Sequence, residues 1–187
     1  MRLRVLVALI GMTSTAWAGD DAALQAQVFG HALDTDNGYA CFMRQYTADH
    51  LASHPHQNVT DIVLLLTGKP KPDVSYTAGV DFKFRKHKKH FQAYGDCPSV
   101  SADTSTGSEQ KLSCGIDCDG GTIAVKLKDA DTVIVSLPSG VNVSPDDISD
   151  AHFGTDDSVF KLARAPAKNC LPLAGEDEDK AALKKLP

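Results

Sequence analysis

Three histidines lie close together in the chain, at positions 50, 54 and 56. His50 and His54 would share one face of a helix that reached this far, because residues four apart are neighbours on a helix. Imidazole nitrogens at such a spacing are ligands for zinc or copper. Pro55 disturbs the backbone at His54, so the competing interpretation is a helix end that enters a loop. His50, His54 and His56 therefore give a zinc or copper site as one hypothesis, and no other cofactor is predicted.

Positive charge is concentrated in one short stretch of an otherwise acidic chain. Between positions 83 and 90, two histidines accompany Arg85, Lys86, Lys88 and Lys89. Concentrated charge of this kind attracts the phosphate or carboxylate groups of lipid headgroups, anionic polysaccharides or acidic proteins. The alternative is a hydrophilic strand tip that prevents edge-to-edge pairing. We predict an anion- or partner-binding tip at these four residues and weigh it against that alternative.

Cysteines supply the other reactive groups: Cys41, Cys97, Cys114, Cys118 and Cys170. Neither Cys-x-x-Cys nor Cys-x-x-Cys-His occurs, which removes the usual support for thioredoxin-like exchange and for haem attachment. We expect two disulfides and one spare thiol. Cys114 and Cys118 are too far apart to bond to each other if the piece between them is extended. We favour Cys97 with Cys114, which closes a loop rich in serine and threonine, and otherwise the connectivity stays open.

Residues 1–18 have the features of a signal peptide. Arginines precede a short apolar run, Val5 to Ile10, and Ala16-Trp17-Ala18 places small residues at the two positions that a signal peptidase reads. We expect cleavage after Ala18 and a periplasmic or secreted protein, where disulfides persist. This apolar run is the longest in the chain and is too short to cross a bilayer, so no membrane-spanning segment is predicted.

The composition is typical of one compact domain, with 187 residues of which 42% are hydrophobic and 23% charged. Acidic residues number 24, against 19 lysines and arginines. Affinity for nucleic acid comes largely from neutralising phosphates with basic residues, so this balance argues against a nucleic-acid partner. We expect a signal peptide over 1–18, a single disulfide-stapled β-rich domain over 19–175, and a charged tail or short helix over 176–187.

Two helices are predicted near the start of the mature chain. Apolar residues recur at helical spacing from Leu24 to Leu33, and Asn37-Gly38 is expected to end that helix. A second helix is expected from Thr47 to Ser53. It must end near His54, because a proline follows and disfavours helical backbone at the residue before it.

After residue 59 the apolar period changes to two, which is typical of strands with one buried face. Val59 to Leu66 predicts a central strand, and shorter candidates are 141–143 and Val159 to Leu162. In three stretches, apolar residues alternate most clearly with other residues, most of them polar or charged. The apolar residues are Val80, Phe82 and Phe84; Ile123, Val125 and Leu127; and Val133, Val135 and Leu137. Connections between strands are short, which makes neighbouring strands antiparallel. The expected fold is mainly β (α+β): an antiparallel meander that forms a small barrel or sandwich, with an N-terminal helix packed on it.

Three stretches resemble landmarks of a group of small exported bacterial proteins that contain cysteines and have no known activity: Cys41 to Tyr46, His50 to Val59 and Leu112 to Gly121. The resemblance would cover most of the mature chain. It implies export and a shared fold, and it carries no catalytic residue.

No catalytic motif is found in the sequence, which favours a non-enzymatic role. A hydrolase whose nucleophile and base meet only in the fold stays open. The first hypothesis is an exported small domain that binds a protein, a polysaccharide or an anionic surface through the basic tip. The alternative is a periplasmic zinc- or copper-binding protein that uses the clustered histidines.

Overall fold

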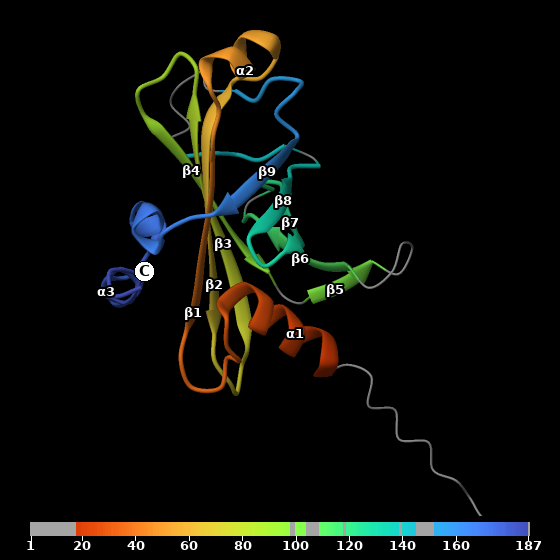
Figure 1. Ribbon diagram of the computed structural model, residues 1–187, viewed down its shortest axis with the longest axis vertical. Helices are drawn as coiled ribbons and strands as arrows, with labels where there is room; N and C mark the ends of the chain where they lie inside the picture. The colour runs from red at the N-terminus through yellow and green to blue at the C-terminus, as the bar shows by residue number, and fades with distance from the viewer. Residues whose placement is uncertain are drawn as a thin grey trace, which may run out of the picture.

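The computed structural model of the chain describes residues 18–97, 100–103, 109–117, 119–138, 140–144 and 152–186 (Figure 1). Residues 1–17 of the predicted signal peptide and Cys118 lie outside this part. Within it, no helix has the length and apolar character needed to span a membrane. The elements, of which η1 is a 3-10 helix, are α1 (Ala18–Phe29), β1 (Gly38–Gln45), α2 (Ala48–Ser53), β2 (Val59–Lys69), β3 (Ser75–Phe84), β4 (His90–Cys97), β5 (Val100–Asp103), β6 (Glu109–Gly115), β7 (Thr122–Asp129), β8 (Thr132–Ser136), β9 (Val159–Arg164), η1 (Ala167–Leu173) and α3 (Asp177–Leu183).

The strands form one antiparallel sheet in the order β4-β3-β2-β1-β9-β8-β7-β6-β5. Strand β4 also pairs with β6, and this pairing joins the two ends of the sheet. The result is a closed barrel of eight strands, with β5 paired to β6 as an addition. The predicted antiparallel meander is confirmed. The sequence analysis expected either a barrel or a sandwich, and the structure is a barrel.

The interior of the barrel is filled by the apolar residues that alternate along its strands. The predicted inward residues of β3, β7 and β8 are all buried. Aromatic rings pack edge to face at one end, where the ring centroid of Phe153 lies 4.9 Å from that of Phe82 and 5.3 Å from that of Phe84. This packing fixes the strand ends that carry the candidate site described below.

Several element boundaries differ from the prediction. The first helix ends at Phe29 rather than at Asn37-Gly38, because Gly30 adopts a φ of +78° and its N–H donates to the carbonyl of Ala26, 3.1 Å away. The stretch 141–143, predicted as a strand, makes only an isolated bridge to Gly121. Strands β1, β4, β5 and β6 were not predicted, whereas α2, β2, β3, β7, β8 and β9 lie where the sequence places them.

Helix α1 packs over one end of the barrel on a pair of glycines. Gly38 of β1 and Gly68 of β2 face each other in the ladder. A Cβ atom on Gly38 would lie 2.5 Å from Cγ of Phe29, and one on Gly68 would lie 2.9 Å from Cε2 of the same ring. The ring also stacks on Tyr76 of β3, with centroids 6.2 Å apart. Glycine at both positions lets Phe29 lie directly on the strand backbone.

Buried polar groups fix the orientation of α1. Gln25 is buried; its amide nitrogen donates to the hydroxyl of Tyr76 at 3.0 Å, and its carbonyl accepts the N–H of Leu33 at 2.9 Å. The Tyr76 hydroxyl donates in turn to Asp21. Burial, and next the hydrogen bond to Asp21, raises the pKa of Tyr76, so the hydroxyl stays a proton donor.

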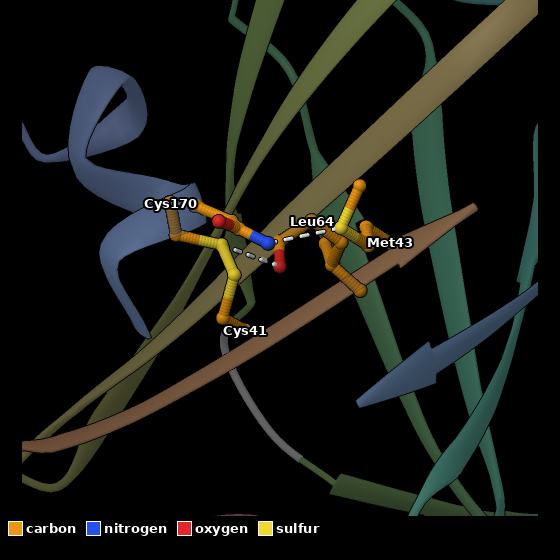
Figure 2. Close-up of a disulfide and its surroundings, with 5 residues drawn as sticks. Cys41, Met43, Leu64 and Cys170 are labelled. Atoms are coloured by element: carbon orange, nitrogen blue, oxygen red, sulfur yellow. Dashed lines mark hydrogen bonds between the residues drawn. A yellow bond between two sulfur atoms is a disulfide. The ribbon is translucent and has the colours of Figure 1, made fainter. Parts of the chain in front are cut away.

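The C-terminal elements η1 and α3 cover the outer face of β1 and β2. Cys41 of β1 forms a disulfide with Cys170 of η1, which Figure 2 shows lying against the two strands. Sγ of Cys170 lies 3.3 Å from the carbonyl oxygen of Leu64. Leu173 and Leu183 complete this second buried cluster. For residues 176–187 the sequence analysis predicted either a charged tail or a short helix. The structure has the helix, over residues 177–183.

The barrel closes at a narrow seam between β4 and β6. Among the described residues the two strands share one ladder pair, Asp96 with Gly115. Directly beside it, Cys97 and Cys114 form the second disulfide, with Cα atoms 4.1 Å apart. The favoured pairing of these two cysteines is confirmed, and the two disulfides together use four of the five cysteines.

Candidate functional site at the basic end of the barrel

The end of the barrel opposite α1 is built from α2, the β3–β4 turn and the segments that lead into β2 and β9 (Figure 1). We call this surface the basic end. It carries six of the seven histidines and the three lysines of the predicted tip: His50, His54, His56, His87, His90, His152, Lys86, Lys88 and Lys89. The structure thus brings together two groups of residues that the sequence treats separately.

Arg85 joins the β3–β4 turn to α2. Its Nε donates to the carbonyl of Gln57 at 2.5 Å, and a terminal nitrogen donates to the carbonyls of Leu51 at 2.6 Å and His54 at 2.8 Å. The last carbonyls of a helix lack partners within it, and a basic side chain can satisfy them. Arg85 was predicted to bind an anion. Its Nε and one terminal nitrogen contact α2 and the segment that follows it, and anion binding by Arg85 stays a prediction.

The three lysines of the turn are exposed. Within the described part of the chain, Lys86, Lys88 and Lys89 form no ion pair and no side-chain hydrogen bond, and the ion pairs found there involve other residues. Ammonium groups without neighbouring carboxylates leave a local positive potential on an acidic protein.

A small pocket of about 160 Å³ lies beside these lysines. Its lining includes Asn58, Lys86, His87 and His152, which all carry nitrogen donors. His87 packs edge-on against Phe91, with ring centroids 5.6 Å apart, and its Nε2 is buried with no hydrogen-bond partner in the described part of the chain. Nitrogen donors gathered around a small hollow suit an oxyanion.

The clustered histidines are arranged as a stack rather than as a metal cage. The rings of His50 and His54 lie 4.1 Å apart at 15°, and Tyr46 stacks on the far side of His50 at 4.7 Å. Lone pairs of imidazole lie in the ring plane, so stacked rings direct them in parallel and not toward one ion. Nε2 of His50 donates to Gln57 at 3.0 Å, and Nδ1 of His54 donates to the carbonyl of His50 at 2.9 Å.

No group of three histidine, cysteine or carboxylate side chains that could hold a metal ion occurs among the residues described, which include His50, His54 and His56. A zinc or copper site would need these side chains to rearrange. The metal hypothesis stays a prediction, and metal analysis of untagged protein with and without the H50A substitution tests it: stoichiometric metal lost in H50A would support it.

Asp157 ties the segment before β9 to the start of β2. Its carboxylate is buried and accepts the N–H groups of Asn58 at 2.7 Å, Gly154 at 2.8 Å and Val59 at 3.2 Å. Burial raises the pKa of Asp157, although the three N–H donors act in the opposite direction. This contact fixes the position of Asn58 in the lining of the pocket.

The sequence analysis missed a polar chain on the outer face of β3 and β4. Asp81 is one of the charged residues that alternate with Val80 and Phe82 in the sequence, so it is predicted on the outer, solvent-facing side of the strand, but it is only 6% exposed. It accepts Nδ1 of His90 at 2.6 Å and Nε2 of Gln92 at 2.9 Å, and the hydroxyl of Tyr94 donates to Gln92 at 2.9 Å. The prediction for Asp81 is wrong because side chains from the neighbouring strand cover it. Only the hairpin register, in which 81 faces 92 and 83 faces 90, brings these residues together.

Comparisons of the chain with protein-family models, with curated proteins and with solved structures find no match.

Proposed function

We propose that the protein is an exported, non-enzymatic domain that binds an anionic surface through the lysines of its basic end. The observation that carries the proposal is the exposure of Lys86, Lys88 and Lys89 on one turn, without carboxylate partners among the described residues. The whole chain has a formal charge of −5, so attraction to an anionic surface has to be local.

The turn that carries the lysines is held in place on both sides. The β3–β4 ladder extends to the pair Lys83 and His90, directly beside the turn. Arg85 anchors the start of the turn to α2, and His87 packs on Phe91. A site that is already ordered loses little conformational freedom when it binds, which favours affinity.

Export is supported by the signal-peptide features of residues 1–18 and by the two disulfides, since such bonds persist mainly in oxidising compartments. Alkylation of protein recovered from its native compartment tests this part of the proposal. We expect one reactive thiol. Five reactive thiols would remove the support for an exported, disulfide-stabilised domain.

Vesicle co-sedimentation tests the binding surface. We expect the protein to bind vesicles that contain phosphatidylglycerol and not to bind vesicles of phosphatidylcholine alone. It should dissociate as the salt concentration is raised from about 0.05 to 0.5 M. A lysine near an anionic lipid surface contributes about 1 kcal/mol. The K86E/K88E/K89E variant should therefore bind about 100-fold more weakly or worse.

The matched control is K161E/K184E/K185E, which makes the same charge change at exposed lysines on β9 and at the C-terminal end of α3. It should keep most of the affinity. An equal loss of affinity in both variants would mean that only net charge matters, and it would contradict the assignment of binding to the lysines of the tip. Absence of binding to any anionic vesicle would overturn the proposal for lipid surfaces.

A further inference from the structure

Tyr94 presents an open aromatic face on the outside of the barrel. It is 48% exposed and is the one exposed phenylalanine, tyrosine or tryptophan ring in the part of the chain that the structure describes. It faces Gly79 across the β3–β4 ladder, and a Cβ atom on Gly79 would lie 3.0 Å from Cε1 of the ring. The ring therefore lies on the backbone of Gly79, with its hydroxyl held by Gln92. The Cδ1–Cε1 side of the ring is the part closest to Gly79, and nearly half of the side chain is exposed to solvent.

Grooves lie on both sides of this ring. One, of about 280 Å³, runs over the outer face of β2 and β3 and is walled by η1 and α3; Thr67 and Thr77 contribute hydroxyls to it. The other, of about 440 Å³, lies at the seam and includes Asn142. Both are lined by Tyr94 and Asp117. We call the two together the Tyr94 groove.

The strand backbone at Tyr94 also lacks a partner on the seam side. Gln92 exchanges two main-chain hydrogen bonds with Ser144, of 2.8 and 2.7 Å. Its N–H and C=O therefore point away from β3, and because this direction alternates along a strand, those of Tyr94 point the same way. Asp96, two residues beyond Tyr94, pairs with Gly115. Between these bridges, the described residues give Tyr94 no ladder partner at the seam. Within the described part of the chain, the main-chain N–H and C=O of Tyr94 therefore have no ladder partner beside the ring.

The charges of the groove restrict its ligand. Three carboxylates line it, those of Asp96, Asp117 and Asp179, against the single ammonium of Lys69. An anionic polymer would be repelled, so this groove is distinct from the surface in the proposed function. Strand addition by a peptide needs a run of unpaired backbone, and among the described residues only one position is open between the two bridges.

We propose that the Tyr94 groove binds a neutral saccharide chain. The C–H face of a pyranose ring would stack on the open face of Tyr94, because the negative ring face attracts polarised C–H groups. Carboxylates accept strong hydrogen bonds from sugar hydroxyls, and threonine hydroxyls and the Asn142 amide can donate and accept. Grooves on both sides of one platform accommodate sugar units that continue past the stacked one. An apolar platform with a few placed polar groups is the usual composition of a ligand site.

Calorimetric titration of the full chain with cellohexaose, chitohexaose, maltohexaose and laminarihexaose tests the proposal. We expect at least one of them to bind. The Y94A substitution should weaken that binding about tenfold or more, because the stacking platform is lost. The Y94F substitution keeps the ring and should stay within about threefold of the natural chain. A shift of the Tyr94 ring resonances on addition of sugar would locate the ligand independently.

V159A is the matched control, since it removes another exposed apolar side chain, on β9. It should bind the saccharide normally, and so should K86E/K88E/K89E, which separates this site from the basic end. Binding of none of the four saccharides, or equal affinity in Y94A and the natural chain, would overturn the proposal. Binding of a lysine-rich peptide in their place would assign the groove to a cationic partner.

Discussion

Cys97 and Cys114 face each other across the seam of the barrel, next to the one ladder pair that joins β4 to β6 among the described residues. Their Cα atoms lie 4.1 Å apart, close to the roughly 4.5 Å of a non-hydrogen-bonded antiparallel pair. The neighbouring ladders β2–β3 and β3–β4 run along nearly whole strands. In the described part of the seam, the disulfide therefore adds a covalent bond to a short ladder, whereas β2–β3 and β3–β4 are joined by hydrogen bonds along their length.

Removal of the two disulfides should have different local effects. In the chain-entropy model, a bond closing a separation of 17 residues contributes about 3 kcal/mol and one closing 129 residues about 5 kcal/mol. We expect C41A/C170A to lose more free energy of unfolding than C97A/C114A in urea titrations. Alanine is used because all four positions are buried.

Hydrogen exchange distinguishes the two variants further. C97A/C114A should speed exchange in β4 and β6, whereas C41A/C170A should speed it in η1 and α3. Unchanged exchange at the seam in C97A/C114A would show that the ladder alone is sufficient to close the barrel.

Arg85 should stabilise α2 rather than bind the anionic ligand. R85A removes the guanidinium donor from the carbonyls of Leu51 and His54, which keep the N–H groups of His54 and Gln57 at this exposed site, so it should cost about 0.5–1.5 kcal/mol locally. We expect faster amide exchange of His54, whose N–H closes the last turn. R85K keeps the charge but not the planar fork, so it should restore only part of the protection. If R85A abolished vesicle binding while α2 stayed protected, Arg85 would be a ligand-binding residue.

Gly38 should be intolerant of even a methyl group. In G38A the added Cβ would collide with Phe29, which should cost about 1–3 kcal/mol and loosen α1. G175A is the matched control, because nothing lies within 4 Å of a Cβ at Gly175. The double variant G38A/F29A should be less destabilised than the sum of the single ones, as measured by thermal unfolding. Additive effects would argue that Phe29 does not limit the space at Gly38.

Most of the strands that the sequence predicts have one buried face; β2, which is buried on both faces, was predicted instead as a central strand. Val80, Phe82 and Phe84 alternate with polar residues because only their side of β3 faces the interior. Strand β1 gives no such pattern: Phe42 points into the barrel, and Cys41 on the opposite face is buried under η1. A strand buried on both faces has no period of two to detect.

The candidate site could be predicted only where its residues are neighbours in the chain. The lysines of the turn form a local run, so their positive charge is visible in the sequence. The carbonyl partners of Arg85 lie 34 and 31 positions earlier, in a helix whose placement depends on the barrel. His90 and Asp81 likewise meet only through the register of the hairpin. Local patterns therefore indicated the charge of the site but not its architecture.

Asp157 gives a pH dependence whose sign follows from its burial. Burial raises the pKa of Asp157 above the ordinary value of 3.8, so the folded chain holds this proton at pH values where the unfolded chain has released it. Its contribution to stability is then full below about pH 4 and is lost as the pH rises through the folded pKa. Urea titrations of the natural chain and of D157N from pH 3 to 7 measure this contribution.

The D157N substitution removes the titrating group and keeps one carbonyl to accept the N–H groups of Asn58 and Gly154. We therefore expect D157N to be less stable at every pH, but the gap should narrow as the pH rises above about 4. D61N, at a half-buried carboxyl of β2, is the control for the loss of one negative charge. A gap between the natural chain and D157N that widened with pH would mean that the three N–H donors outweigh burial and that the carboxylate is the favoured form in the fold.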